Sequence, residues 1–457
     1  MVATVDNRER REAGERARGR ADELLAQDVR VIAVTWVDNS GVTRVKAVPV
    51  AKLESAVTWG IGASPCFDTF LFSDELATPG AVGEVRLHPD LDRLTVLAAQ
   101  PGWAWAPADR YDLDGNAHPV DQRTLARVAR AKLAERGYRA RMAFEVEWVI
   151  GADAAAFEPA VRGPAYGHAR LVDRSDYVRD VVVALGEQGV EVDQIHPEYA
   201  AGQFEVSVAA ADPVAAADDY VLVRETIRAV TARHGLRASF SPKVLADGVG
   251  NGGHVHMSLW REDVNLFAGG DGPFGLTTEA DGFAAGILEH LPALLAIGAP
   301  SVASYLRLVP QHWAGAYAAW GLENREAALR MVTGPAGNRE RAANLEVKCF
   351  DQMANPYLLV AALIFAGLSG IDVKATLPEP VDVDPALLSE DERAARGIRR
   401  LPSTLDESTA AFEHDPVLPA EFGPDLTAAI LAVRHGEIEH FAKKPEKYIV
   451  DQLRWIH

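Results

Sequence analysis

The sequence predicts an α+β protein in which a small, sheet-rich N-terminal domain precedes a larger domain of strands and helices. Short strand-like segments fill the first hundred residues, a turn-rich segment follows at 112–119, and amphipathic helices alternate with strands beyond it. The 457 residues suffice for two or three domains of roughly 100–200 residues each. We therefore expect a helical lead-in at 1–28, a sheet domain at 29–115 and a larger domain at 116–457.

Composition and charge exclude several classes of function. Lys and Arg total 46 against 65 for Asp and Glu, a net charge of −19, whereas phosphate backbones and anionic lipids select basic surfaces. Cys66 and Cys349 lie far apart and form neither a disulfide framework nor a thiolate metal cluster, which suits a reducing cytosol. Residues 1–20 are charged, unlike a signal peptide, and the apolar run Tyr357–Leu368 is shorter than the about 20 residues that span a bilayer. We expect a cytoplasmic protein that binds neither nucleic acid nor membrane.

The elements of the first domain follow from alternating hydrophobicity and turn residues. Polar residues at helical spacing predict a helix over Arg8–Gln27. Val29–Val37 alternates, and Val42–Val50 follows after a turn at 38–41, which predicts a hairpin. Further short strands are predicted at Glu84–Leu87, Thr95–Leu97 and Trp103–Ala106. The Asp, Asn, Gly and Pro residues of 112–119 mark the domain boundary.

Beyond this boundary the pattern alternates between helix and strand. Asp212 as an N-cap, with Pro213 at the first helical position, opens a long helix over Val214–His234. Other helices are predicted at Gln122–Arg136, Arg174–Glu187 and Thr278–Ile297, and strands at Phe144–Ile150, Val190–Ile195, Gln203–Val208 and Arg237–Ser241. An arginine-rich region over 307–341 and a mainly helical last third complete the chain.

A glycine-rich loop leads into two histidines in the stretch Gly248–Trp260. Glycines permit positive φ and allow the backbone to approach a ligand closely. His254 and His256 stand two residues apart in a predicted strand, so both imidazoles project from one face. Alone, this pattern fits either a ligand site or a tight turn with two hydrogen-bonded histidines. Matching carboxylates elsewhere in the chain decide between the two.

Two pairs of carboxylates offer that match. Glu145 and Glu147 share one face of an apolar strand, where two buried like charges cost several kcal/mol each unless a cation compensates them. Glu198 precedes an Ala-Gly-Gln turn, and Glu205 lies in the strand after it. Taken singly, the first pair also fits a solvated strand and the second a simple loop. Together with His254, the four carboxylates form an oxygen-rich set that favours Mg²⁺ or Mn²⁺ over zinc or copper.

A third group of residues is basic. Arg307, Arg325 and Arg330 fall in one tract, and Glu346 and Lys348 follow it. Guanidinium groups bind carboxylates and phosphates in bidentate geometry. Exposed arginines of a surface helix are the alternative, and the apolar neighbours of Arg325 and Arg330 argue against it.

The order of these motifs resembles the glutamine synthetase family, of class I type. The matching segments are the two carboxylate pairs, the glycine loop with its histidines, Arg307 in RLVP, Arg325 and Arg330 in NR-x4-R, and Asn355-Pro356-Tyr357. The resemblance covers the chain from about residue 29 onward and is nearest to members that form γ-glutamyl amides with amines and polyamines. It implies a β-grasp N-terminal domain and a catalytic domain with a curved antiparallel sheet and helices. It also implies ring-shaped homo-oligomers, usually two stacked hexamers, with active sites shared between subunits.

The resemblance implies a role for each matching residue. Glu147 and Glu198 resemble ligands of one metal ion, and Glu145, Glu205, His254 and Glu346 those of another ion and its surroundings, with two or three Mg²⁺ or Mn²⁺ ions per site. His256, Arg330 and Asn344 match nucleotide-binding positions, and Gly250, Arg307 and Lys348 match glutamate-binding positions. Arg325 and Arg330 match residues that neutralise phosphate during transfer. The implied chemistry has two steps, in which ATP phosphorylates the γ-carboxylate of glutamate and an amine then displaces phosphate.

Departures from the family concern the amine. Ammonium-using members carry a glutamate six residues after the arginine of the RLVPG motif, a position that is Trp313 here. Their ammonium-site aspartate, which the neighbouring subunit contributes, aligns with Ser64, and Asp68 replaces it only if the loop shifts. A tryptophan ring contacts an organic ammonium with about 0.5–2 kcal/mol; neutral drift of the loop is the alternative. Asn344 and Lys348 also stand where the family usually has arginine.

These residues predict an ATP-dependent ligase that joins the γ-carboxylate of L-glutamate to a primary amine larger than ammonia, such as a polyamine or ethanolamine. Ser64 and Trp313 are the predicted amine pocket, and Trp313 is counted with Arg325 and Arg330 as catalytic. Two alternatives stay open: an ordinary glutamine synthetase that uses ammonium, and a catalytically silent ring with a structural or regulatory role. The complete metal set argues against the silent ring, since such a protein is free to lose these side chains.

Overall fold

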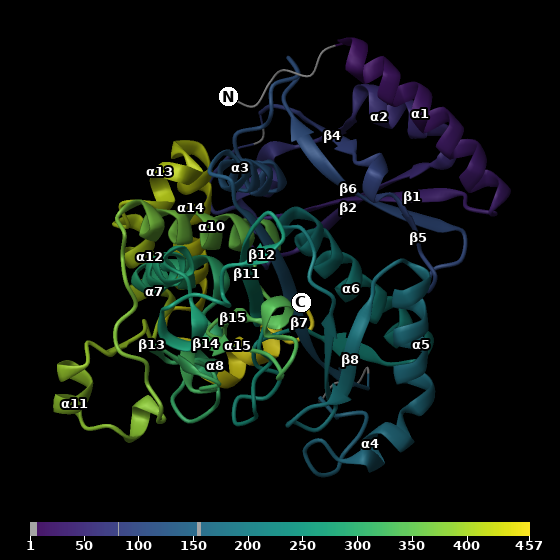
Figure 1. The fold of residues 1–457 in the computed structure, drawn as a ribbon. Helices are drawn as coiled ribbons and strands as arrows, with labels where there is room; N and C mark the ends of the chain where they lie inside the picture. The colour runs from purple at the N-terminus through teal and green to yellow at the C-terminus, as the bar shows by residue number, and fades with distance from the viewer. Residues whose placement is uncertain (1–6, 81, 153–156) are drawn as a thin grey trace.

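Two β-sheets organise the chain (Figure 1). The structure is a computed structural model that describes residues 7–80, 82–152 and 157–457. Over these residues the first sheet has six strands in the order β2-β1-β6-β4-β3, with β5 beside β6. The second has ten, in the order β16-β13-β14-β15-β11-β7-β9-β8, with β10 beside β7 and β12 beside β11. The first six residues of the predicted lead-in lie outside the described residues.

The N-terminal sheet is covered on one face by two helices (Figure 1). Helices α1 (Asn7–Ala26) and α2 (Leu53–Trp59) pack against each other there. The strands are β1 (Val31–Val37), β2 (Thr43–Pro49), β3 (Ile61–Ala63), β4 (Val85–Pro89), β5 (Thr95–Val96) and β6 (Trp103–Tyr111). Strand β1 pairs antiparallel with β2, as the predicted hairpin requires, and parallel with β6. Short 3₁₀ helices occupy Val50–Lys52, Pro65–Thr69 and Leu91–Arg93.

The second sheet is built around the long central strand β7 (Arg139–Gly151), which pairs antiparallel with β11 on one side and β9 on the other. The remaining strands are β8 (Val192–Pro197), β9 (Gln203–Val208), β10 (Arg237–Ser239), β11 (Val255–Arg261), β12 (Val264–Asn265), β13 (Tyr317–Leu322), β14 (Ala327–Val332), β15 (Asn344–Val347) and β16 (Arg399–Arg400). Strands β13 and β14 pair in parallel, an exception to the expected antiparallel order. Residues from three well-separated stretches of chain therefore meet on adjacent strands around β7.

Helices pack around this sheet. They are α3 (Gln122–Glu135), α4 (His168–Asp173), α5 (Ser175–Glu187), α6 (Pro213–Arg233), α7 (Thr278–Gly298), α8 (Ser304–Arg307), α9 (Arg339–Ala342), α10 (Pro356–Asp372), α11 (Glu390–Ala395), α12 (Leu405–Glu413), α13 (Leu418–Phe422), α14 (Pro424–Phe441) and α15 (Glu446–Leu453), with 3₁₀ helices at Pro273–Gly275 and Pro385–Leu387. In Figure 1, α4, α5 and α6 lie to the right of β7, and α7, α10, α12, α13 and α14 lie to its left. The apolar helix α10 packs against α7 and α3 and is almost wholly buried, as its run of apolar residues predicts. Among the described residues, α7 is long and apolar enough to cross a membrane by length and composition, but 78% of that window is buried inside the protein.

The predicted α+β class is confirmed, and the predicted helices and strands of the first 300 residues mostly begin or end within a few residues of the observed ones. Strand β7 is longer than predicted, and α2, β3 and α4 were not predicted. Strands β13 and β14 lie in the arginine-rich region and β15 just after it, and no strand was predicted in either place. The segments YAAWGL and AALRMV are rich in alanine, which favours helix. Their extended conformation therefore depends on pairing with neighbouring strands rather than on local preference.

Candidate functional site

A cleft of about 650 Å³ lies over one end of the second sheet and collects nearly all the predicted site residues. The predicted residues that line it are Glu145, Glu147, Glu198, Glu205, Gly250, His254, His256, Arg307, Trp313, Arg325, Arg330, Glu346 and Lys348. Asn344 lines an adjoining cavity that also contains Glu145 and His256. Ser64 lines neither cavity of this chain.

Two neighbouring strands hold the first group of carboxylates. On β7 and β9, Glu147 stands directly opposite Glu205 in the antiparallel register. Burial raises the pKa of Glu147 to about 8, and the nearby charges of Glu205 and Glu198 add to this increase. Burial also raises the pKa of Glu205 to about 7. Like charges that are buried this closely favour protonation or a bound cation.

Donors from the surrounding loops orient Glu147. Its Oε2 accepts hydrogen bonds from the backbone N–H of Gly252 at 2.9 Å and from Nε2 of Gln203 at 2.8 Å. The amide of Gln203 also donates to Oδ1 of Asn251 at 2.9 Å. The glutamine of the Ala-Gly-Gln turn therefore ties the carboxylate strand to the glycine loop.

A second group combines carboxylates with the two histidines. Nδ1 of His254 lies 2.9 Å from Oε2 of Glu145 and 3.3 Å from Oε1 of Glu346, and Nε2 of His256 lies 3.1 Å from Oε1 of Glu145. Burial lowers the pKa of His254 to about 4. Burial acts in the same direction on His256, but Glu145 raises the pKa of this imidazole to about 9. Against the effect of burial, Lys348 and the two histidines lower the pKa of Glu346 to about 2.

The potential ligand atoms fall into two clusters. Those of Glu145, His256 and Glu346 lie within 4.8 Å of one another, as do those of His196, Glu198 and Glu205. Glu205, which the resemblance places with Glu145, His254 and Glu346, has its ligand atom in the cluster of His196 and Glu198. His196, which the sequence analysis missed, stands two residues before Glu198 in the chain. The same i, i+2 spacing that singled out the other pairs could have found it.

The donor set fits a hard divalent cation. Carboxylate oxygens outnumber imidazole nitrogens in the two clusters, and such sets suit Mg²⁺ or Mn²⁺. The raised pKa of Glu147 is the physical sign that this group of charges lacks sufficient cationic compensation from the protein itself.

Arg170 fixes the loop that carries Glu198. This side chain of α4 is buried, and within the described part of the chain its guanidinium hydrogen-bonds to backbone carbonyl oxygens. It donates to Glu198 at 2.5 Å, Ala200 at 2.9 Å and Tyr199 at 3.3 Å, and also to Gly163 at 2.6 Å. The hydroxyl of Tyr166, two residues before α4, donates a hydrogen bond to Oε1 of Glu198. The sequence analysis missed both residues because their contacts depend on loop geometry.

The glycine loop serves close packing rather than a left-handed turn. The expectation of positive φ at its glycines is wrong, since those of residues 248–253 all have ordinary φ. A Cβ at Gly252 would lie 2.5 Å from Nε2 of His254 and 2.8 Å from Oε1 of Glu147. A Cβ at Gly250 would lie 2.7 Å from Cγ of Arg307. Side chains at these positions would displace the groups that form the site.

The basic residues lie around the cluster of Glu145, His256 and Glu346. Arg330 donates to Oε2 of Glu346 at 2.9 Å, and Nζ of Lys348 donates to Oε1 of the same carboxylate at 3.0 Å. Nη2 of Arg307 lies 3.3 Å from Nε2 of His254. Arg325 lies exposed at the turn between β13 and β14. Cationic groups therefore lie around the cleft, where they are suited to bind phosphate or carboxylate.

Two aromatic side chains stand at the mouth of the cleft. The rings of Trp313 and Tyr199 meet edge to face, with centroids 4.9 Å apart and an interplanar angle of 85°. About half of each side chain is exposed, 47% for Trp313 and 46% for Tyr199. Tyr199 was not predicted; its position next to Glu198 was the available signal.

The residues expected at an ammonium site are elsewhere in this chain. Ser64 caps the 3₁₀ helix Pro65–Thr69 at the edge of the N-terminal sheet. Asp68 is buried and paired with Arg110, at 2.5 Å, and with His118, at 2.7 Å. Because its carboxylate is already paired, Asp68 is not free to hold an amine in place of the missing aspartate.

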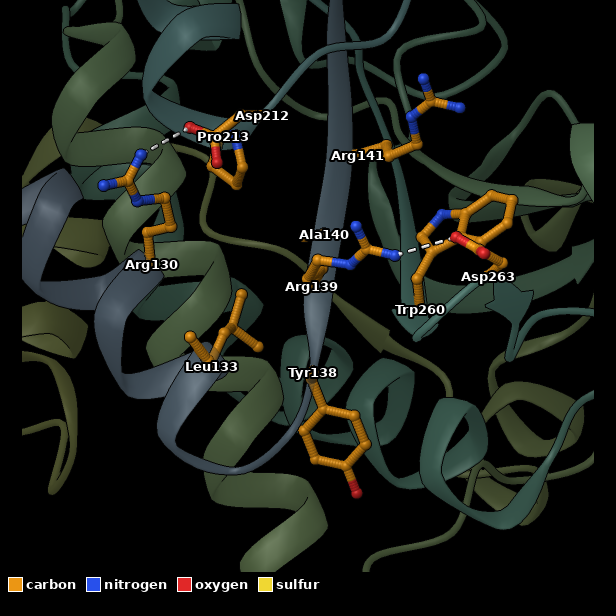
Figure 2. A pocket seen from close by; sticks show the side chains of 11 residues that line it. Arg130, Leu133, Tyr138, Arg139, Ala140, Arg141, Asp212, Pro213, Trp260 and Asp263 are labelled. Atoms are coloured by element: carbon orange, nitrogen blue, oxygen red, sulfur yellow. Dashed lines mark hydrogen bonds and ion pairs between the residues drawn. The ribbon is translucent and has the colours of Figure 1, made fainter.

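Near the cavity beside His256 lies a further one, whose lining side chains are drawn in Figure 2. This further cavity measures about 560 Å³, and the two share Arg141 and Trp260. Arg130 bonds to Asp212 at its one side and Arg139 to Asp263 at the other (Figure 2). None of the predicted site residues lines it.

Comparison with known proteins agrees with this geometry. The model of the glutamine synthetase catalytic domain matches residues 119–453. The chain is 56% identical to the γ-glutamylpolyamine synthetase GlnA3 of Streptomyces coelicolor over 96% of both chains. It is 33% identical to the glutamine synthetase of Halobacterium salinarum, over 93% of this chain and 94% of the other. A crystal structure described as a novel glutamine synthase homolog superposes with a TM-score of 0.85 at 31% identity, over 94% of this chain and 99% of that one.

Proposed function

Because the chain belongs to the glutamine synthetase family, we propose that it joins the γ-carboxylate of L-glutamate to one amino group of a polyamine, with ATP as phosphoryl donor. Enzymes of this family use ATP and divalent metal ions in general. The observation that carries the choice of amine is Trp313, which lines the cleft where ammonium-using members carry a carboxylate. The higher identity to a γ-glutamylpolyamine synthetase than to a glutamine synthetase supports the same choice.

The proposed reaction has two balanced steps. A γ-carboxylate oxygen of glutamate attacks the γ-phosphorus of ATP, and ADP leaves, which forms γ-glutamyl phosphate. The neutral amine nitrogen attacks the carbonyl carbon, inorganic phosphate leaves, and the nitrogen releases a proton. Bound Mg²⁺ or Mn²⁺ neutralises the charge that develops on the phosphoryl oxygens.

The side chains of the cleft divide this work between them. We assign one ion to Glu147, Glu198 and Glu205 and another to Glu145, His254 and Glu346, with a third ion optional. His256 bonds through Nδ1 to Oδ1 of Asn344 at 2.9 Å, and this pair faces the nucleotide. Arg330 and Arg325 neutralise the phosphoryl group during transfer. Gly250, Arg307 and Lys348 hold glutamate, and Ser64 of a neighbouring subunit completes the amine pocket beside Trp313.

The assembly and location are also proposals. We propose a homo-oligomer of two stacked hexameric rings with shared sites, in the cytoplasm. Cys66 and Cys349 are both free, which fits a reducing compartment. A division into a β-grasp domain at 29–115 and a catalytic domain at 116–457 agrees with the family match, which begins at residue 119.

The function is tested by phosphate release from ATP with glutamate, Mg²⁺ and a panel of putrescine, spermidine, ethanolamine and ammonium. We expect the polyamines to give the highest kcat/KM, with the γ-glutamyl amide identified by mass. Turnover with ammonium that equals or exceeds that with every organic amine would identify an ordinary glutamine synthetase instead. No turnover with any amine, combined with no Mn²⁺ binding, would support a silent ring.

A further inference from the structure

The loop that carries Trp313 has an unfavourable backbone conformation. Gln311 has φ = +63° and Trp313 has φ = +54°. L-residues other than Asn and Asp rarely adopt such angles, and bulky ones least of all. Each costs of order 1–3 kcal/mol and persists only where surrounding contacts enforce it. Contacts within the cleft must therefore hold this loop.

The contact between the two rings is too weak to hold the loop by itself. An edge-to-face aromatic pair contributes about 0.5–1.5 kcal/mol beyond the area that it buries, and both Trp313 and Tyr199 remain about half exposed. That gain is smaller than the combined cost of two left-handed residues. A second contact is needed to stabilise the observed position of Trp313.

Glu326 supplies that contact. Its Oε1 accepts a hydrogen bond from the backbone N–H of Trp313 at 2.9 Å, and the backbone of Gln311 also favours the charged form of this carboxyl, against the effect of burial on its pKa. Backbone N–H groups presented by left-handed residues form a small concave site that suits an anion. A hydrogen bond to a charged acceptor contributes roughly 1.5–3 kcal/mol. Together with the ring contact, this bond is comparable to the strain at Gln311 and Trp313.

Glu326 is itself fixed from behind. Its backbone N–H donates to Oδ1 of Asn324 at 3.0 Å. The amide of Asn324 donates to the carbonyl oxygens of Val381 at 2.8 Å and Val383 at 3.0 Å. The carboxylate is therefore held by a well-anchored turn between β13 and β14, and the loop around Trp313 is held by the carboxylate.

We propose that Glu326 is a positioning residue for the amine pocket: its carboxylate holds the loop Gln311–Trp313 in the left-handed conformation that packs the indole against Tyr199. This inference rests on the proposed function, because the aromatic pair is the wall that an alkyl amine contacts. Glu326 acts through the backbone of Trp313. Removing it should weaken amine binding and leave the other substrates unaffected.

The test compares Glu326→Ala, which removes the acceptor, with Glu326→Gln, which keeps an amide oxygen in its place. Steady-state kinetics are measured with putrescine as the varied amine at saturating glutamate, ATP and Mg²⁺. We expect Glu326→Ala to raise the KM for putrescine at least tenfold, with the KM for glutamate unchanged. Glu326→Gln should stay within about threefold of the wild type, since one neutral hydrogen bond replaces a charged one. Asp384→Asn is the control, because Asp384 is a neighbouring acidic residue that caps a 3₁₀ helix.

A double-mutant cycle with Trp313→Ala tests whether Glu326 acts through the indole. In the Trp313→Ala background, where no ring is left to position, Glu326→Ala should change the KM for putrescine less than twofold. Additive effects of the two substitutions would overturn the proposal. So would an unchanged KM for putrescine in Glu326→Ala, since the loop would then not depend on this carboxylate. If the wild-type protein turns over ammonium but not putrescine, the proposed function itself fails, an outcome distinct from unchanged kinetics in the variants.

Discussion

At the scale of single residues, a carboxylate proposed to bind metal opposes the stability of the metal-free protein. Glu147 is buried, and burial together with two neighbouring glutamates raises its pKa to about 8. A glutamate in an unfolded chain titrates near 4.3. The folded protein thus binds more protons than the unfolded chain between these two values. In this window the free energy of unfolding falls as pH rises, because deprotonation favours the unfolded state.

Glu147→Gln should therefore stabilise the metal-free protein while it weakens metal binding. The amide cannot be deprotonated, so the variant keeps its stability up to pH 8, where the wild type loses part of its own. We expect the Tm of the EDTA-treated variant to exceed that of the wild type by about 2 °C or more at pH 8. The difference should shrink towards pH 5. Mn²⁺ binding measured by calorimetry should fall at least tenfold.

Glu187→Gln on the exposed end of α5 is the control and should change neither the Tm nor the affinity for Mn²⁺. A Tm below that of the wild type at pH 8 would contradict this account of Glu147. It would mean that its hydrogen bonds from Gly252 and Gln203 outweigh the charge repulsion.

At the scale of elements, the sequence predicts the helices and strands that have a local signal, such as residue spacing, a capping residue or an apolar run. The i, i+2 spacing of Glu145 and Glu147 states which residues share a face of β7 without knowledge of the fold. The N-cap of α6 and the apolar run of α10 are similarly local. Periodicity therefore accounts for the metal-binding strands and for the helices that support them.

Other parts of the site depend on contacts between segments far apart in the chain. No sequence pattern links Trp313 to Glu326. Only the folded loop brings the backbone N–H of Trp313 to the carboxylate of Glu326. Tyr199 meets Trp313 across more than a hundred residues. The pairing of β13 with β14 is likewise a tertiary effect. The amine pocket was accordingly predicted less completely than the metal site.

Helix α4 and the Glu198 loop form one such tertiary unit. The guanidinium of Arg170 bonds to the backbone carbonyl oxygens of Glu198, Tyr199 and Ala200 and to that of Gly163. Each buried carbonyl left without a donor costs about 1–3 kcal/mol. The arginine therefore fixes where Glu198 and Tyr199 lie.

Arg170→Met should release this loop and reduce metal affinity without removing any ligand. We expect Mn²⁺ to bind at least tenfold more weakly, the range usual for a lost supporting contact of a metal ligand. Arg170→Lys, which keeps a single charged donor, should give an intermediate affinity. Calorimetric titration measures the Mn²⁺ affinity of both variants, and circular dichroism verifies that each is folded. Arg179→Met on the exposed face of α5 is the matched control. Unchanged Mn²⁺ affinity in Arg170→Met would show that Glu198 is held by other means.

At the scale of the whole molecule, a single chain supplies only part of the proposed amine pocket. Ser64 lies just beyond β3, the edge strand of the N-terminal sheet, and lines no part of the cleft. Asp68 is paired with Arg110 inside its own domain. If sites are shared, the Ser64 loop of one subunit reaches the cleft of the next, in an assembly of roughly 590 kDa for twelve chains of 49.3 kDa.

Mixed rings can test this sharing directly. Ser64→Trp would block the pocket that its loop completes in a neighbour, while its own cleft stays intact. Arg330→Ala would inactivate its own cleft, while its Ser64 loop stays intact. Each variant should be nearly inactive alone, yet rings dissociated and reassembled from equal amounts of both should regain about a quarter of wild-type activity. That fraction follows because half the clefts are intact and, in random rings, half of those face an intact loop. Native mass spectrometry confirms that the two chains have mixed. Mixed rings that regain no activity would mean that the Ser64 loop acts within its own chain, and full activity of Ser64→Trp alone would mean that Ser64 has no part in the pocket.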